Sequence, residues 1–191
     1  ASARQVRIFG QLIDLFREMY PGSLRYVHMA NSAGILKFKD AHFNLVRPGL
    51  AAYGVNPIGT APDRRLRPVM SVRTRIAFLK TVERGTPISY GSTYRTRQRS
   101  VIATLPIGYS SGYPLRLSNR SRVLIRGRAF PVAGRVTMDQ IMVDLGGWTG
   151  ARLWDEVVLI GTSGTRRVPA EELARLSGTI PYEILCGIHP K

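Results

Sequence analysis

A proline- and arginine-rich stretch at residues 56–68 divides the chain into two parts with different hydrophobic periods. The stretch itself has no helical or strand-like repeat of apolar residues, which is typical of a linker. Before it, helical and strand-like runs alternate, whereas after it short β-type runs follow one another. One folding pattern cannot cover both parts, so the sequence predicts two domains of different class.

The part before this stretch has the helix–strand rhythm of an α/β barrel. Residues 5–19 repeat apolar side chains at helical spacing, and Leu24–Val27 and Phe43–Val46 are predicted strands. Between the strands, Asn31-Ser32 is a polar cap that opens a short helix. About sixty residues are too few to close a barrel of this kind. We therefore expect residues 1–60 to form a fragment of one, followed by a linker over residues 61–68.

The part after the linker, residues 69–191, is predicted to be a mostly antiparallel β domain, either a barrel or a sandwich. Glycine- and asparagine-containing turns separate its apolar runs. A late helix is expected at Pro169–Leu176, with acidic residues in its first turn and Gly178 after its end. The predicted strands are Met70–Val82, Ser100–Leu105, Arg122–Ile125, Phe130–Val132, Ile141–Leu145 and Glu156–Ile160.

The chain is strongly basic, with 28 Lys and Arg against 12 Asp and Glu and a net charge of +16. Such a charge attracts polyanions, so nucleic acid is one possible partner. The arginine groups are not interleaved with aromatic residues as base-stacking surfaces are, which makes nucleic acid the weaker hypothesis. The apolar runs are strand-sized and no signal segment opens the sequence, so we expect a cytoplasmic protein that does not enter a membrane. One cysteine and three scattered histidines predict neither a disulfide nor a metal site.

Four short blocks place small, polar or tyrosine residues at the ends of predicted strands, where binding residues often lie. A serine hydroxyl and helix amides can bind phosphate, a fixed arginine supplies a cation, and a glycine lets a neighbouring tyrosine project. Each block also has an ordinary structural explanation: a helix cap, a core tyrosine, or a buried Asp–Arg pair. The blocks are His28–Ser32, Val46–Leu50, Ile88–Tyr94 and Gly134–Gln140.

Taken in order, and joined by Leu105–Tyr109 and Thr179–Ile184, these blocks resemble the alanine racemase family over essentially the whole chain. The resemblance implies a (β/α)8 barrel that binds pyridoxal 5'-phosphate, followed by a β domain. This chain is similar to the last strands of the barrel plus the β domain. The family pairs two chains head to tail, so that each site combines one chain's barrel with the partner's β domain.

The resemblance also implies roles for individual residues. Tyr90 matches the catalytic tyrosine, which works on one face of the alanine substrate while a lysine works on the other. Interconversion of L- and D-alanine, which supplies peptidoglycan precursors, needs a base on both faces. A free phenol has a pKa of about 10, so a tyrosine base requires neighbouring cations or hydrogen bonds.

The remaining matches concern the cofactor and the substrate. Arg47 matches the arginine that donates to the pyridine nitrogen of the cofactor. The phosphate-holding groups match Ser32, the backbone amides of Gly49 and Leu50, and the Tyr182 hydroxyl. The substrate-binding positions match the backbone amide of Met138, together with Tyr109 and Arg135 near the opening of the substrate channel.

Three departures from the family pattern change what is expected of this chain. The cofactor lysine is absent, because Lys37, Lys39, Lys80 and Lys191 do not lie at a matching strand end. Thr137 stands where many members have cysteine, and residues 109–112 lack an aspartate that is common after the tyrosine. We therefore expect the chain to carry the tyrosine half of a shared site and to be inactive by itself.

Two alternatives stay open from the sequence. The first is a non-catalytic, basic β-domain module that binds acidic partners, which the net charge of +16 favours. The second is a racemase for another amino acid, since one fold of this kind serves several substrates.

Overall fold

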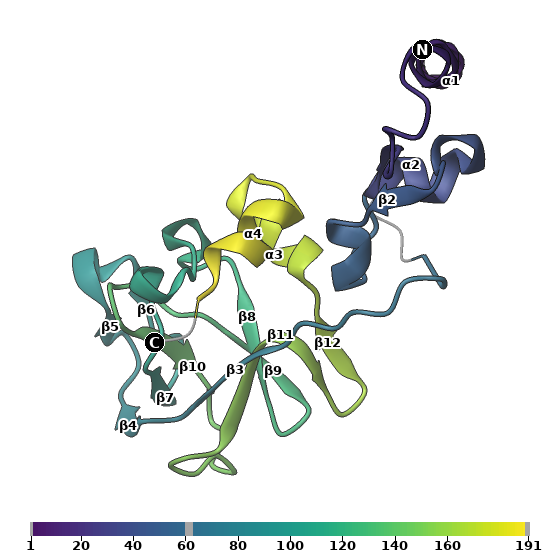
Figure 1. The fold of residues 1–191 in the computed structure, drawn as a ribbon. Coiled ribbons are helices and arrows are strands. Elements are labelled where there is room, and N and C mark those ends of the chain that lie inside the picture. Colours follow the sequence, from purple (N-terminus) through teal and green to yellow (C-terminus); the bar gives the residue numbers. More distant parts are fainter. Residues whose placement is uncertain (1, 60–62, 190–191) are drawn as a thin grey trace. The chain divides into compact units, whose positions relative to one another are not determined.

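The computed structural model describes residues 2–59 and 63–189, and the chain separates into two compact units, Ala1–Val69 and Met70–Lys191 (Figure 1). Each unit has its own secondary structure. Residues 61 and 62 of the predicted linker lie outside the described residues.

The first unit contains a parallel βαβ arrangement. Strand β1 pairs with β2 in parallel, with His28 opposite Leu45 and Asn31 opposite Arg47, and helix α2 connects them along the chain. Parallel strands joined by a helix are the repeating unit of an α/β barrel, so the fold class predicted for this part is confirmed. The elements of this unit are α1 (Ser2–Met19), β1 (His28–Asn31), α2 (Ser32–Lys37), η1 (Lys39–Ala41), β2 (Leu45–Arg47) and η2 (Leu50–Tyr53).

The strand predicted at Leu24–Val27 is wrong, because those residues bond to a side chain instead of to a neighbouring strand. The Asn44 side chain accepts a hydrogen bond from the Val27 amide at 2.7 Å and donates one to the Arg25 carbonyl at 3.0 Å. The strand begins only at His28. The second strand begins later than predicted as well, at Leu45, since Phe43 has a φ of 47° and cannot extend a strand.

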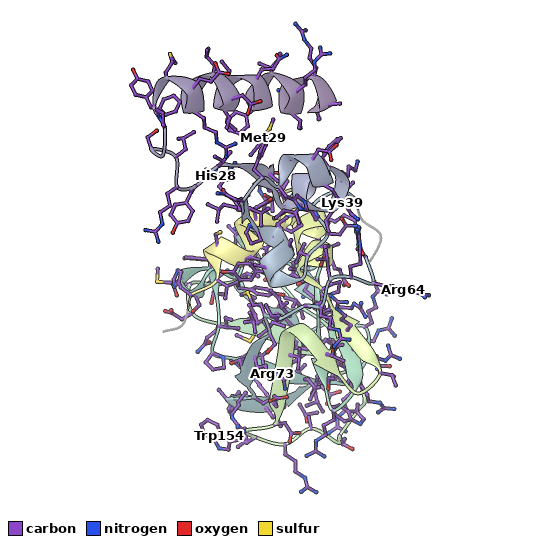
Figure 2. All side chains as sticks on the ribbon, turned by 45° about the vertical axis from the view of Figure 1, so that its right-hand side comes forward. His28, Met29, Lys39, Arg64, Arg73 and Trp154 are labelled. Atoms are coloured by element: carbon purple, nitrogen blue, oxygen red, sulfur yellow. The ribbon has the colours of Figure 1, made fainter. Side chains whose placement is uncertain are left out.

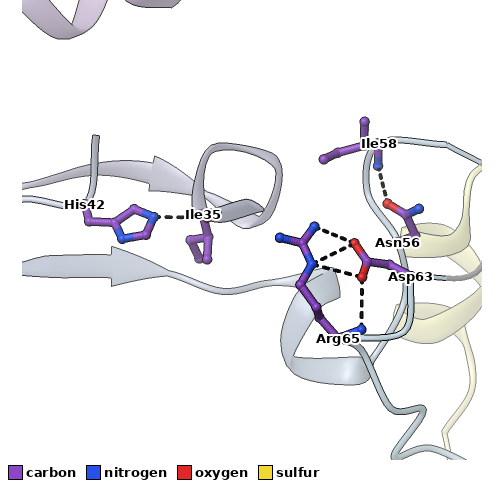
Figure 3. Close-up of polar contacts among 6 residues, drawn as sticks. All are labelled: Ile35, His42, Asn56, Ile58, Asp63 and Arg65. Atoms are coloured by element: carbon purple, nitrogen blue, oxygen red, sulfur yellow. Dashed lines mark hydrogen bonds and ion pairs between the residues drawn. The ribbon is translucent and has the colours of Figure 1, made fainter. Parts of the chain in front are cut away.

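The short helix predicted after Asn31 is confirmed, because the Asn31 Oδ1 atom accepts a hydrogen bond from the Gly34 amide at 3.0 Å and caps α2. Further along, local side-chain bonds shape the turns of this unit (Figure 3). The His42 Nε2 atom donates to the Ile35 carbonyl at 3.0 Å. Asp63 accepts from the Arg65 guanidinium at 2.6 Å, and this hydrogen bond lowers the pKa of its carboxyl to about 2.

The second unit is built from antiparallel strands, as predicted. One sheet has the order β12-β11-β8-β9, with β3 also paired to β11, and a second has the order β10-β7-β4. An isolated bridge between Val132 and Val143 joins β10 to the end of β9. The strands are β3 (Val72–Arg75), β4 (Phe78–Val82), β5 (Pro87–Ile88), β6 (Tyr94–Arg95), β7 (Ser100–Leu105), β8 (Arg122–Ile125), β9 (Arg128–Pro131), β10 (Ile141–Asp144), β11 (Glu156–Ser163) and β12 (Arg166–Val168).

The run predicted as one strand over Met70–Val82 is two strands that pair with different sheets. Between them, the Ile76 amide donates to the Asp155 carbonyl at 3.0 Å, and the Trp154 amide donates to the Ile76 carbonyl at 2.9 Å. These bonds turn the chain, so that β3 pairs with β11 and β4 pairs with β7. Figure 2 labels Arg73 on β3, whose guanidinium pairs with Glu156 on β11, and the exposed Trp154.

The core of the second unit lies between its sheets and two late helices. Leu124, Ile141 and Leu159 are completely buried. Helices α3 (Ala170–Ser177) and α4 (Pro181–Gly187) lie side by side at one end of the strands (Figure 1). Helix α3 confirms the predicted helix to within one residue at each end, and three single-turn helices, η3 (Tyr90–Ser92), η4 (Tyr109–Ser111) and η5 (Leu115–Leu117), complete the loops. Of the helices in residues 2–59 and 63–189, none is long and apolar enough to span a membrane.

Candidate functional site

In the first unit, an arginine and a histidine meet across the two parallel strands. Arg47 ends β2 and His28 begins β1 (labelled in Figure 2), and their side chains meet with 2.7 Å between Arg47 Nη1 and His28 Nδ1. A guanidinium can only donate, so His28 Nδ1 accepts and the ring proton lies on Nε2. Within the part of the chain that the structure describes, no carboxylate pairs with Arg47. The histidine therefore orients the guanidinium and leaves its positive charge uncompensated.

The other predicted cofactor residues of this unit gather where the parallel strands end. Ser32 follows β1 and is almost fully buried, and its hydroxyl oxygen accepts the Ala51 amide at 3.1 Å. Gly49 and Leu50 follow β2 and begin η2. The structure thus brings Ser32, Gly49 and Leu50 together at one edge of the strand pair, a position where hydroxyl and amide donors can meet an anion. The Gly49 amide already donates to the Arg47 carbonyl at 3.1 Å.

Tyr90 projects from a tightly constrained loop of the second unit. It opens η3, and its side chain is 74% exposed. Ser89 before it has a φ of 63° and donates from its hydroxyl to the Arg135 carbonyl at 2.8 Å. A side chain on Gly134 would lie 2.5 Å from the Ile88 carbonyl oxygen, so only glycine allows the two segments to approach this closely. The loop backbone is therefore held in place, and the Tyr90 phenol is exposed.

Tyr109 and Met138 are brought together by a second close approach. The Tyr109 amide donates to the Thr137 carbonyl at 3.0 Å, and the Ser110 amide donates to the Met138 carbonyl at 2.9 Å. A side chain on Gly108 would lie 2.2 Å from the Thr137 oxygen. Tyr109 and Met138 both remain about half exposed.

Residues Gly134–Met138, which we call the platform segment, therefore hold both tyrosine loops. Sequence reasoning missed the side chains that support this segment. Asn119 accepts the Gly134 amide at 2.5 Å and donates to Thr93 Oγ1 at 3.0 Å, and Ser118 Oγ accepts the Val136 amide at 2.9 Å. The signal in the sequence is an asparagine, a residue type that favours turns, and Asn119 does have a left-handed φ of 59°.

The substituted position Thr137 has a structural role at the end of the platform segment. Its hydroxyl oxygen accepts the Gln140 amide at 3.1 Å and donates to the Gln140 carbonyl at 2.8 Å. Nearby, Ser110 donates to Asp139 Oδ1 at 2.7 Å, in the loop that departs from the family pattern. The threonine thus closes the turn that presents Met138.

Tyr182 and the described lysines lie on several different elements of the two units. Tyr182 lies on α4 of the second unit, and its side chain is 41% exposed, whereas the other predicted cofactor residues belong to the first unit. Lys37 ends α2, Lys39 opens η1 (labelled in Figure 2) and Lys80 lies within β4. Lys191 lies outside the described residues. No described lysine stands at the carboxyl end of β1 or β2.

A parallel βα fragment with anion-compatible groups at its strand ends, followed by an antiparallel domain with projecting tyrosines, defines the class of two-domain proteins that join a barrel to a β domain. Comparison with known families agrees. The family description "Alanine racemase, C-terminal domain" matches residues 69–191, and "Alanine racemase, N-terminal domain" matches residues 1–57. The chain belongs to the alanine racemase family.

Individual relatives show the same relationship. An alanine racemase of Symbiobacterium thermophilum is 52% identical over 162 residues, which cover 84% of this chain and 43% of that protein. An alanine racemase of Sorangium cellulosum is 43% identical over 96% of this chain and 49% of its own length. The chain spans about half the length of these curated relatives.

Solved structures agree with the sequence comparison. An alanine racemase from Clostridium difficile 630, in complex with cycloserine, superposes with a TM-score of 0.87 at 38% identity over 98% of this chain and 49% of that one. The alanine racemase from Streptomyces coelicolor A3(2) gives a TM-score of 0.87 at 40% identity over the same shares.

Proposed function

We propose that this chain is the carboxyl-terminal portion of a pyridoxal-phosphate-dependent alanine racemase and contributes one of its two bases, Tyr90. The observation that carries the proposal is the exposed phenol on a loop that two hydrogen-bonded segments hold in place. A base must reach the α-carbon without changing its own position, and this loop provides both exposure and rigidity. The reaction supplies D-alanine for peptidoglycan precursors in the cytoplasm.

The described residues fit two parts of the cofactor. The buried Ser32 hydroxyl and the start of η2 lie together where a phosphate can be held, and Tyr182 is proposed to add a hydroxyl. Arg47, whose guanidinium bonds to His28, would hold the pyridine nitrogen of the cofactor by donating a hydrogen bond, which would leave that nitrogen unprotonated. When bound, pyridoxal phosphate supplies an electron-withdrawing ring that weakens the α C–H bond of alanine.

Substrate handling falls to the second unit in this proposal. Tyr90 Oη takes the α-proton on one face, or returns one there in the opposite direction. The Met138 amide binds the substrate carboxylate, and Tyr109 and Arg135 line the approach to it. In a head-to-tail homodimer, these groups complete the barrel site of the partner subunit. The second base is a lysine, which no described strand end of the first unit provides, so we propose that the chain by itself does not racemize alanine.

A chimera tests the proposal. The 162 matched residues of the Symbiobacterium thermophilum relative are replaced by those of this chain, and conversion of L- to D-alanine is measured with added pyridoxal phosphate. We expect an active enzyme, in which Tyr90→Phe lowers kcat by about 10²–10⁴-fold because a general base is lost. The 191-residue chain under the same conditions is expected to show only the background rate.

Tyr94→Phe is the matched control, since it removes a phenol hydroxyl four residues away that bonds to Asp144 and does not project from the loop. It should leave kcat within about threefold. A chimera that folds and binds the cofactor but does not racemize would contradict the role of this chain. Racemization by the chain alone would contradict the proposal that activity requires a lysine that this chain does not provide.

A further inference from the structure

A pocket of about 640 Å³ in the second unit is lined by arginines from three separate parts of the chain. Arg116 and Arg120 come from η5 and the turn after it, Arg135 from the platform segment, and Arg175 from the last turn of α3. No aspartate or glutamate is among the described residues that line it. Four positive charges therefore converge on one cavity.

These charges are not neutralised by neighbouring side chains. Within the described ranges, none of the ion pairs includes any of the four arginines. Glu172 of α3 is engaged by Arg122, with both carboxylate oxygens bonded at 2.8 Å, and Glu171 makes no ion pair with Arg175 one turn away. Arg116 makes one long bond of 3.4 Å to the Ser177 carbonyl. Like charges held together in this way repel unless an anion joins them.

A buried hydroxyl in the wall of the pocket also lacks a partner. Ser177 lines the pocket and is only 4% exposed, and its Oγ atom has no hydrogen bond to any described residue. An unsatisfied buried hydroxyl is unfavourable, and a ligand oxygen would satisfy it. The other polar side chains of the wall, including Thr93, Ser118 and Asn119, are already bonded within the loops. The groups that remain available are therefore mainly hydrogen-bond donors.

We propose that this pocket binds a small oxyanion with more than one negative charge, such as a diphosphate or a phosphate ester. Guanidinium groups match phosphate oxygens in pairs, and four of them favour a multivalent anion over a single carboxylate. A volume of about 640 Å³ holds more than one phosphate group, since a water molecule in the liquid occupies only about 30 Å³. The site does not depend on the racemase proposal, although Arg135 belongs to both.

Isothermal titration of the 191-residue chain with inorganic pyrophosphate tests this site. We expect saturable binding of one pyrophosphate per chain, weaker binding of orthophosphate, and a loss of affinity as salt is raised. Arg175→Ala and Arg120→Ala should each weaken binding at least tenfold. Ser177→Ala should weaken it severalfold with no change in net charge, which a general electrostatic attraction would not do.

Arg84→Ala is the matched control, because it removes the same charge from an exposed turn that does not line the pocket. Its affinity should stay within about twofold of the unmodified chain. Equal losses for Arg84→Ala and Arg175→Ala, or no loss for Ser177→Ala, would overturn the proposal. If an arginine variant fails to fold, the unmodified chain still tests the proposal, because pyrophosphate should raise its melting temperature and acetate should not. The activity of the chimera has no bearing on either result.

Discussion

At the scale of single residues, Tyr94 and Asp144 form a partly buried pair that ties β6 to β10. The Tyr94 hydroxyl donates to Asp144 Oδ2 at 2.7 Å, and Asp144 Oδ1 accepts the Gly146 amide at 2.7 Å. Burial, and after it the hydrogen bond to Asp144, together raise the pKa of Tyr94 to about 12. The folded chain therefore favours the neutral phenol more strongly than the unfolded chain does, for which the pKa is about 10.

This pair predicts a loss of stability in alkali. The contribution of Tyr94 is complete below about pH 10 and is lost as the pH rises towards about 12. Tyr94→Phe should reduce this alkaline loss, and at neutral pH it should lower the free energy of unfolding by about 1 kcal/mol because Asp144 loses a donor. Urea unfolding at pH 7 and between pH 10 and 11.5 measures both effects.

Part of the alkaline loss should survive in Tyr94→Phe, because burial also raises the pKa of Tyr113. The exposed Tyr20 provides the control, and Tyr20→Phe should leave the free energy of unfolding at pH 7 unchanged. An unchanged alkaline profile in Tyr94→Phe would show that the pair does not couple folding to pH.

At the scale of elements, the loop that carries Tyr109 depends on a glycine for its position. A side chain on Gly108 would meet the carbonyl oxygens of Thr137 and Met138 at 2.2 and 2.4 Å. We predict that Gly108→Ala destabilises the second unit by about 2–3 kcal/mol, because backbone atoms cannot yield as flexible side chains do. Chemical denaturation monitored by circular dichroism measures the change.

Gly147→Ala is the control for this substitution, since no atom lies within 4 Å of the added side chain and its φ is not positive. It should change stability by less than about 0.5 kcal/mol. Equal effects of the two substitutions would contradict the close approach between the Tyr109 loop and the platform segment.

The elements that could be predicted from sequence are those with a clear apolar pattern. Strands β7 and β8 begin and end at the predicted residues, and α3 lies within one residue of its prediction. Strand β12, with two exposed arginines among its three residues, was missed because only its pairing with β11 defines it. Helix α4 overlaps the block Thr179–Ile184, whose short apolar pattern does not by itself predict a helix. The strand predicted at Leu24–Val27 is wrong for the opposite reason. Its apolar pattern predicts a strand, but its backbone forms hydrogen bonds with the Asn44 side chain.

At the scale of the whole molecule, helix α1 exposes an apolar face. Leu12 and Met19 are more than half exposed, and only Ile13 of this helix is buried. Exposed apolar surfaces of this kind promote association in water. We predict that the chain self-associates at micromolar concentration, and that Leu12→Lys reduces both its apparent mass in light scattering and its binding of a hydrophobic dye.

The control for this prediction adds the same charge at a neighbouring exposed position of α1. Gln11→Lys should leave the apparent mass and the dye binding unchanged. If Gln11→Lys has the same effect as Leu12→Lys, the cause is net charge and not the apolar face.

The candidate site likewise contains residues that short blocks of sequence can identify and residues that only the fold brings together. The roles proposed for Tyr90, Arg47 and Ser32 rest on short blocks of sequence, which a family resemblance can match residue by residue. The arginine pocket could not be predicted, because Arg116, Arg135 and Arg175 are far apart in sequence and meet only in the folded domain. The bond between Arg47 and His28 likewise joins two different strands, and sequence alone does not show that these strands pair.

The platform segment has a consequence for attempts to redesign this protein. Because five consecutive residues anchor both tyrosine loops, Tyr90 and Tyr109 cannot be repositioned independently. In a mutant library that varies only one loop, the platform segment stays in the position that the other loop requires, and this limits how far the varied loop can move. Specificity would be transferred between relatives most effectively by exchanging the two loops and the platform segment as a single cassette, together with Asn119.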